Sequence, residues 1–290
     1  MVDFSKPISD RTVDSAKEYY NDMYKDIPER ILQSHWYGEL ERLKYEFKKF
    51  LLHTVIEGKR NIFWIDGFDG SRKTSISTEL TNPSTQFANN GVLQRISLDV
   101  PNAWENAMKI TQRYEQESMP GLGRTVFLDR TWNNRAFVQH LYWYCTPEQY
   151  EEFLETLVPE LERFLEQYDW LQITQFFFDI TKEEQKQRLK ERWEDPLRSH
   201  RLSESDKKAV GKHGKILKQR TILSPLYEQV WIPFMNVKTI DKKRAMIAIL
   251  KYILQDKDYP KKSRKLDFTP DTKIIQPTKD EVAKVIASKI

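Results

Sequence analysis

Five short runs of β-type residues, each ending in an aspartate, place the strongest constraint on how this 290-residue chain can fold. They span residues 61–66, 92–99, 125–129, 171–179 and 236–241. Longer segments with helical spacing of apolar residues lie between these runs, as in residues 147–167. Strands that alternate with helices form a parallel sheet covered on both faces. The sequence therefore predicts a three-layer α/β/α fold, with ligands bound beyond the strand ends where the aspartates lie.

Two helical segments flank this pattern in different ways. Residues 36–56 place apolar side chains on one helical face and are expected to pack on the sheet. Residues 181–193 begin with a capping-box signature, Thr181 and Glu184, and continue as a highly charged helix. A core helix would not have this composition, so the second segment is expected at the surface.

The chain after residue 255 is rich in lysine and irregular, and it ends in a short helical pattern at 279–290. We therefore expect residues 256–278 to form a linker or surface arm, whose removal leaves the catalytic part unchanged. The domain division predicted is a helical extension at 1–35, a catalytic domain at 36–255 and a basic linker with a short helix at 256–290.

The bulk composition excludes several classes of protein. The chain has 47 basic and 43 acidic residues, which describes a mixed surface and not a polycation that coats nucleic acid. A single cysteine, Cys145, excludes an internal disulfide and a Cys-based zinc site, and we expect its side chain to be buried. The first residues lack an apolar signal region, and no apolar run reaches membrane-spanning length. A cytoplasmic protein without a membrane partner is expected.

The segment IFWIDGFDGSRKTS, residues 62–75, places a glycine turn and a lysine between a strand and a helix start. A phosphate-binding loop (P-loop) needs this context, with backbone N–H groups, a lysine and a hydroxyl at the anion. Gly67, Gly70, Lys73 and Thr74 fit these tasks, whereas Arg72 stands where the strict pattern has glycine. The alternative is an ordinary turn that contains glycine.

The segment TVFLDRTWNNRA, residues 125–136, ends a strand with Asp129, the position of the magnesium-holding carboxylate in P-loop enzymes. Arg130 and Arg135 follow closely, and guanidinium groups present paired donors that match phosphate oxygens. An isolated Asp-Arg pair is more often a loop salt bridge, but its occurrence together with the Gly-Lys loop favours a phosphate site.

A third group of cations surrounds Pro196, which interrupts a helix. It consists of Arg188, Arg192, Arg198 and Arg201. A lid over residues 181–220 would bring these charges onto the transferring phosphates and exclude water. A solvated charged helix is the alternative that the sequence leaves open.

Several segments resemble the polyphosphate kinase type 2 family, in the order of that family, over residues 36–255. They are YGELERLKYEF, the G-F-D of the loop, W-x8-R-Y from Trp104 to Tyr114, DRTWNNRA, YCTPEQYEEFL, EEQKQRLKERWEDPLRSHRLS and IDKKRA. The resemblance implies a P-loop kinase-like α/β/α fold with an arginine-bearing lid. It also implies phosphate transfer, with Mg²⁺, between polyphosphate or a nucleoside triphosphate and a nucleotide.

The resemblance assigns roles to individual residues. Asp69 and Asp129 would be the magnesium-linked carboxylates, and Lys73 would bridge phosphates. The remaining predicted phosphate or nucleotide contacts are Arg130, Arg135 and Asn134 on the acceptor side, Arg188 and Arg192 on the lid, and Arg198 and Arg201 on the donor path. The sequence departs from the family pattern at Arg72, which replaces a loop glycine, and at Asn133, where the family has tyrosine.

Two other functions keep the same fold. The acceptor could be a modified nucleoside or base in nucleic acid, bound with help from the Lys-rich C-terminal arm. Alternatively, the chain could be a degenerate nucleotide-binding protein that has lost catalysis. The expected partners are a nucleotide and polyphosphate, with nucleic acid through the C-terminal arm as the alternative, and a homo-oligomer is expected.

Overall fold

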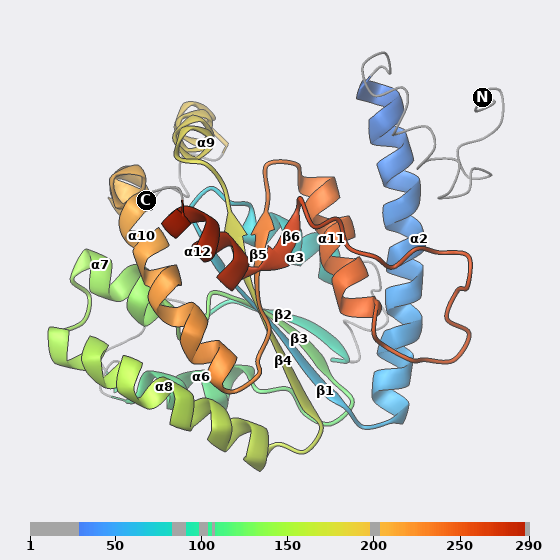
Figure 1. Ribbon diagram of the computed structural model, residues 1–290, viewed down its shortest axis with the longest axis horizontal. Helices are drawn as coiled ribbons and strands as arrows, with labels where there is room; N and C mark the ends of the chain where they lie inside the picture. Colours follow the sequence, from blue (N-terminus) through green and yellow to red (C-terminus); the bar gives the residue numbers. More distant parts are fainter. Residues whose placement is uncertain (1–28, 83–90, 99–103, 106–107, 198–203, 288–290) are drawn as a thin grey trace.

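A computed structural model describes residues 29–82, 91–98, 104–105, 108–197 and 204–287. At its centre lies a six-stranded sheet with the order β2-β3-β1-β4-β5-β6 (Figure 1). The strands are β1 Arg60–Gly67, β2 Leu93–Ile96, β3 Thr125–Asp129, β4 Leu171–Asp179, β5 Phe234–Lys238 and β6 Ile275–Pro277. The first five are parallel, and β6 runs antiparallel to β5 at one edge. The sheet thus has the parallel character expected from the sequence.

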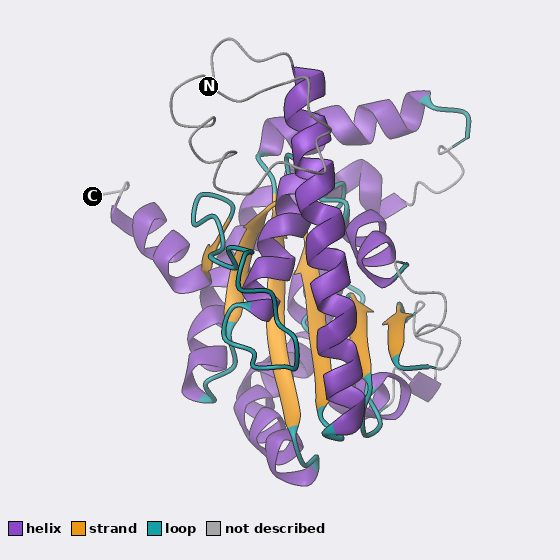
Figure 2. Ribbon diagram, turned by 90° about the vertical axis from the view of Figure 1, so that its right-hand side faces the viewer, coloured by secondary structure: helices purple, strands orange, loops and turns teal. Residues whose placement is uncertain are grey.

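Helices cover both faces of this sheet. One face is covered by α2, α3 and α11, and Figure 2 shows α2 crossing that face in front of the strands. The other face carries α6, α8 and α10. The helices are α2 Glu29–Ile56, α3 Lys73–Thr81, α6 Ile110–Ser118, the π-helix η2 Arg135–Gln139, α7 His140–Tyr142, α8 Pro147–Gln167, α9 Lys182–Glu194, α10 Glu204–Gln229, α11 Lys242–Leu254 and α12 Thr278–Ala287. The α/β/α fold is confirmed.

Apolar residues follow one another without interruption along the strands because both faces of the sheet are buried. In β1, Phe63 and Ile65 pack with α2 and α11, whereas Ile62 and Trp64 pack with α6 and α8. All four side chains are at most 5% exposed. A strand buried on both faces has no need of polar residues in alternation. Among the described helices, none is long and apolar enough to cross a membrane.

Most expected elements are present, with differences at their ends. Strand β3, strand β4 and helix α8 have the bounds predicted from the sequence. Strand β2 ends earlier than expected, at Ile96. Strand β5 begins two residues earlier than predicted, at Phe234, and ends three residues earlier, at Lys238. Asp241 therefore does not end a strand; its carboxylate instead caps α11 by accepting a hydrogen bond from the Arg244 amide at 3.0 Å.

Residues 256–278 were predicted to form a linker or surface arm, and the structure shows that they do not form a free linker. Ile275 is 2% exposed and lies in β6, which pairs with β5. Tyr259 is 3% exposed and donates a hydrogen bond to Glu46 of α2 at 3.0 Å. Lys262 donates to the carbonyl oxygens of Leu254, Gln255 and Lys257 at the end of α11. This segment is a strap across the sheet edge, which the lysine-rich composition concealed because Lys262 binds backbone carbonyls and does not extend into solvent.

Candidate active site

The loop between β1 and α3 depends on glycine at two positions. Gly67 has φ +136°, and a Cβ there would lie 2.3 Å from the carbonyl oxygen of Phe178 on β4. Gly70 has φ +84°, in the left-handed region that glycine adopts without strain. The loop therefore passes close to β4 and turns into α3 at Lys73. Arg72, at the expected glycine position, also has a left-handed backbone (φ 68°), and its side chain is exposed.

The Lys73 side chain turns back into this loop. Its ammonium donates hydrogen bonds to the carbonyl oxygens of Gly67 at 2.7 Å and Phe68 at 2.9 Å, and it lies 4.0 Å from Asp69. Burial lowers the pKa of Lys73, and the negative charges of Asp69 and Asp129 oppose this shift. A lysine enclosed among carboxylates at a helix start is suited to binding phosphate oxygens.

Asp129 ends β3 beside the first turn of α3. Its Oδ2 accepts hydrogen bonds from Thr74 Oγ1 at 2.7 Å and from Arg95 at 2.6 Å. Its Oδ1 is buried and accepts no hydrogen bond from the described part of the chain. Sequence reasoning missed Arg95, although an arginine inside the β-type run of 92–99 was a usable signal. The free carboxylate oxygen and the neighbouring hydroxyl are the hard oxygen ligands that Mg²⁺ prefers.

Within the described part of the chain, protein side chains alone do not form a complete metal cluster. Among the described residues, no three His, Cys, Asp or Glu side chains come together in a way that could hold a metal ion. Mg²⁺ is commonly held by one or two carboxylates with water and substrate phosphates. The Asp129 carboxylate and the nearby Asp69 therefore fit a magnesium ion that is bound together with a phosphate substrate.

Arg130 completes the group around the loop. Its backbone has φ 72°, and its amide donates to the Ile65 carbonyl at 2.9 Å, so the chain turns sharply beside β1. Its guanidinium lies 3.4 Å from Asp69 and is 45% exposed. The fold thus brings together Asp69, Lys73, Thr74, Asp129 and Arg130 from two segments of the sequence.

A buried network of hydrogen bonds around Asp66 lies in the protein interior next to this group. Asp66 is 2% exposed and accepts hydrogen bonds from the Thr131 amide and hydroxyl, from Asn133 Nδ2 and from Gln175 Nε2, at 2.6–3.1 Å. Burial raises the pKa of Asp66, and the hydrogen bonds from Thr131 and Asn133 oppose this shift. Because Thr131 and Asn133 follow Arg130 closely in the chain, Asp66 holds the turn that carries Asp129 and Arg130. Sequence analysis assigned Asp66 no role.

Asn133 belongs to this network and not to an open acceptor surface. Its side chain is fully buried, and its Oδ1 accepts a hydrogen bond from the Tyr227 hydroxyl at 2.9 Å. The same hydroxyl accepts from Trp132 Nε1 at 3.1 Å. The departure from the family pattern at this position is therefore a change in the interior of the protein.

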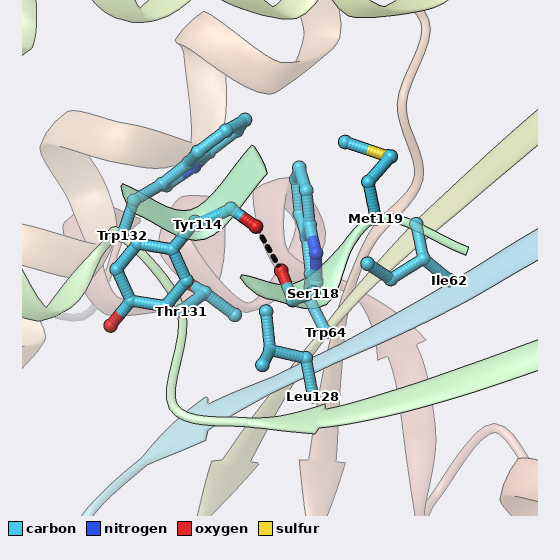
Figure 3. A pocket seen from close by; sticks show the side chains of 8 residues that line it. All are labelled: Ile62, Trp64, Tyr114, Ser118, Met119, Leu128, Thr131 and Trp132. Atoms are coloured by element: carbon cyan, nitrogen blue, oxygen red, sulfur yellow. Dashed lines mark hydrogen bonds between the residues drawn. The ribbon is translucent and has the colours of Figure 1, made fainter. Parts of the chain in front are cut away.

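Next to the network, Trp64 and Trp132 pack edge to face and help to line a small apolar pocket (Figure 3). On its other side Ser118 donates a hydrogen bond to the Tyr114 carbonyl oxygen. Since aliphatic and aromatic groups dominate its walls, this pocket is unsuited to a phosphate chain.

Arg135 lies in a separate environment. It is 5% exposed and lines a cavity of about 120 Å³ together with Lys109, Thr111, Gln149 and Glu152 among others. Its Nε is buried and donates no hydrogen bond to any described residue. Its charge lies beside half-buried Cys145, whose thiol pKa is raised by burial against the effect of this arginine. The preceding Asn134 donates to the Tyr114 hydroxyl at 3.4 Å.

The predicted lid arginines have different environments. Arg188 donates hydrogen bonds to backbone carbonyls of Gly70, Thr239 and Ile240, each at 3.0 Å. Arg192 lies 3.6 Å from Asp206 and so connects α9 with α10. Arg198 and Arg201 lie outside the described residues.

Comparisons with known proteins place this chain among members of one family. The family model for Polyphosphate kinase 2 (PPK2) matches residues 32–265. The NDP-polyphosphate phosphotransferase 2 of Ruegeria pomeroyi is 30% identical over 82% of this chain and 67% of its own length. The GDP-polyphosphate phosphotransferase of Pseudomonas aeruginosa is 34% identical over 63% of this chain and 50% of its own length. The crystal structure of Polyphosphate Kinase 2 from Arthrobacter aurescens TC1 has a TM-score of 0.65 at 20% identity, covering 88% of this chain and 86% of that one.

Proposed function

The chain belongs to the polyphosphate kinase 2 family and is a phosphotransferase, and from this premise we propose that it transfers phosphate between polyphosphate and a nucleotide with Mg²⁺. The two curated relatives described above carry names for polyphosphate phosphotransfer with NDP and GDP. A nucleoside diphosphate is therefore the acceptor that we propose for this chain, with polyphosphate as the donor.

The observation that carries the proposal is the grouping of Lys73, Thr74, Asp129 and Arg130 around one glycine-bearing loop. Phosphoryl transfer needs positioning and charge stabilisation more than covalent chemistry. Lys73 and Arg130 supply positive charge for the phosphate oxygens, and the first turn of α3 adds unpaired amide groups. Such groups act most strongly on charge that develops during transfer.

Asp129 and Asp69 are the residues that we propose to hold magnesium. Asp129 Oδ1 is buried without a hydrogen bond from any described group, and Thr74 places a hydroxyl oxygen beside the same carboxylate. Magnesium, when bound there, would neutralise charge on the phosphate oxygens. Arg95 holds the second oxygen of Asp129 and so orients the carboxylate.

Arg135, in its separate cavity, is the residue that we propose to contact the acceptor. Its buried Nε and the cavity of about 120 Å³ that it lines support a role in binding a polar group of the nucleotide. Asn134 lies beside it and is held by Tyr114. Arg192 is proposed as a lid cation, since its salt bridge to Asp206 is long and its side chain is 34% exposed.

A panel of donors and acceptors tests the function. Polyphosphate and ATP are each incubated with the nucleoside mono- and diphosphates, and products are separated by anion-exchange chromatography. We expect nucleoside triphosphate from polyphosphate and a diphosphate, loss of activity with EDTA, and recovery with Mg²⁺. Lys73→Ala and Asp129→Asn should each lower kcat/KM by more than about tenfold while the circular dichroism spectrum stays unchanged. A folded protein that yields no nucleotide product in any combination would contradict the proposal.

A further inference from the structure

We infer that Gln185 and Arg188 of α9 are positioning residues, and that Arg188 is not a lid arginine. Both residues hold the backbone of the loop between β1 and α3, residues 68–72, which we call the phosphate loop. This inference rests on the proposed function only for its kinetic consequence. The contacts that carry it lie at Asp69 and Gly70, where the first two turns of α9 pack against the loop.

Gln185 binds the loop from a fully buried position. Its side chain is 0% exposed, and Nε2 donates a hydrogen bond to the Asp69 carbonyl oxygen at 3.1 Å. In a trans peptide the carbonyl and the following amide point in opposite directions. Fixing the Asp69 carbonyl toward α9 therefore turns the Gly70 N–H away from α9, toward the other side of the loop.

Arg188 binds the next carbonyl and anchors it to the sheet. Its Nη1 donates to Gly70 O, its Nη2 donates to Thr239 O and Ile240 O, and its Nε donates to Glu184. A guanidinium has five N–H donors, so these four bonds leave one for any other partner. The side chain is 9% exposed, which is unlike an arginine that waits in solvent for a substrate.

The packing around Gly70 agrees with this role. A Cβ at Gly70 would lie 3.8 Å from the Arg188 Cβ and 3.8 Å from Leu189, so α9 is in ordinary contact with the loop. The Ser71 amide then donates to Phe68 O at 3.0 Å and closes the turn. Because the start of α9 is tied to both the loop and the end of β5, any lid movement has to begin after this part of the helix.

Hydrogen exchange in the substrate-free protein tests the inference independently of catalysis. Gln185→Met and Arg188→Met each remove donors while they keep side-chain length. We expect amide exchange in a peptide covering residues 67–74 to rise by about tenfold or more, the scale of one lost hydrogen bond. Gln187→Met and Lys190→Met, on the exposed side of the same helix, are the matched controls. They should leave both the amide exchange of residues 67–74 and kcat unchanged.

Kinetics separates a positioning role from a phosphate contact. A displaced loop lowers kcat by about tenfold, whereas a lost phosphate contact raises the donor KM, more so at low salt. Arg188→Lys should fail to restore kcat, because one ammonium cannot reach all three carbonyls. Unchanged loop exchange in both Met variants, with a salt-dependent rise in donor KM that lysine rescues, would overturn the inference. If exchange rises in a protein that transfers no phosphate, the positioning contacts stand and the proposed function fails.

Discussion

Two arginines near the phosphate loop hold backbone conformations that side chains usually avoid. Arg72 has φ 68° and Arg130 has φ 72°. The left-handed conformation costs a residue other than glycine roughly 1–2 kcal/mol. For Arg130, the strained backbone conformation places the guanidinium beside the Asp69 carboxylate. Arg72 is exposed, and the positive charge of Arg188 lies near it.

Arg72→Gly should therefore separate stability from substrate binding. We expect the free energy of unfolding to increase by up to about 1 kcal/mol, since glycine relieves the backbone strain. The donor KM should rise with kcat spared, most clearly at low salt, because an exposed charge attracts the donor equally in the ground and transition states.

Lys261→Gly is the matched control for strain, because Lys261 has φ 60°, is exposed and lies in the C-terminal strap. It should gain stability without a change in KM. Thermal unfolding and steady-state kinetics at two salt concentrations make the comparison. A large gain in kcat for Arg72→Gly would instead indicate that the natural loop is a weakened one.

At the scale of secondary-structure elements, an ion pair joins α6 to α8. Arg163 donates to Glu115 at 2.8 Å, and the Tyr168 hydroxyl donates to the same carboxylate at 2.8 Å. Partial burial alone would raise the pKa of Glu115, but the hydrogen bonds from Arg163 and Tyr168 and the arginine charge together lower it from 4.5. The pair holds α6 against α8 on the face of the sheet below the candidate site.

The stability that this pair contributes should depend on pH. The folded-state pKa of Glu115 is below its unfolded value, so the contribution is present above pH 4.5 and is lost as pH falls through the folded value. Arg163 is 38% exposed, so solvent screening limits the contribution to about 0.2–1 kcal/mol. Glu115→Gln should lower the free energy of unfolding at neutral pH, and urea titrations should show this difference vanishing in acid.

The C-terminal strap, residues 256–278, differs most from what the sequence predicted, because part of it packs against the sheet. Ile275 is 2% exposed, and β6 covers the edge of β5. Ile275→Ala should lower the free energy of unfolding by about 2–5 kcal/mol. Lys279→Ala, at an exposed position of α12, should stay within about 0.5 kcal/mol.

Truncation after Gln255 should lower the yield of soluble protein, since it also removes Tyr259 and uncovers a strand edge. Denaturant unfolding and expression assays measure these effects. A truncated protein as stable as the full chain would mean that the strap only lies against the sheet.

Across the whole molecule, Arg220 ties α10 to the sheet. It is 2% exposed and donates to Asp179 at the end of β4 at 3.0 Å and to Asn236 of β5 at 2.5 Å. Two turns earlier on α10, the His213 ring stacks on Phe68 of the phosphate loop with 4.1 Å between ring centroids. Helix α10 therefore connects strands β4 and β5 with the loop between β1 and α3.

Arg220→Met should destabilise the protein by about 3–5 kcal/mol, because it leaves Asp179 without its buried cationic partner. A double-mutant cycle with Asp179→Asn should recover part of this loss, since the second change removes the unpaired charge. Denaturant titration of the four proteins measures both effects. Additive losses would show that the two side chains are not energetically coupled.

The sequence by itself determined the layer order, most strand positions and the place of the glycine-bearing loop between β1 and α3. Apolar periodicity and strand-ending aspartates such as Asp129 depend on local spacing, so they can be seen in one dimension. Gly67, Gly70, Lys73 and Thr74 likewise stand within one short segment, and the resemblance to a family added the function. The first 28 residues of the extension predicted at 1–35 and the arginines at 198 and 201 lie outside the described residues and stay predictions.

Only the tertiary structure decided what the long-range side chains do. The sequence indicated that Arg188 is a free charge on a lid. In the structure it donates to the carbonyl oxygens of Gly70 and Thr239, which are 118 and 51 residues away in the sequence. Asp66 and Gln175 meet because β1 pairs with β4, and Lys262 binds the end of α11. Composition shows that a residue is charged, but its partners depend on which strands and helices become neighbours. For this reason the phosphate loop was predictable, whereas the residues that hold it in place were not.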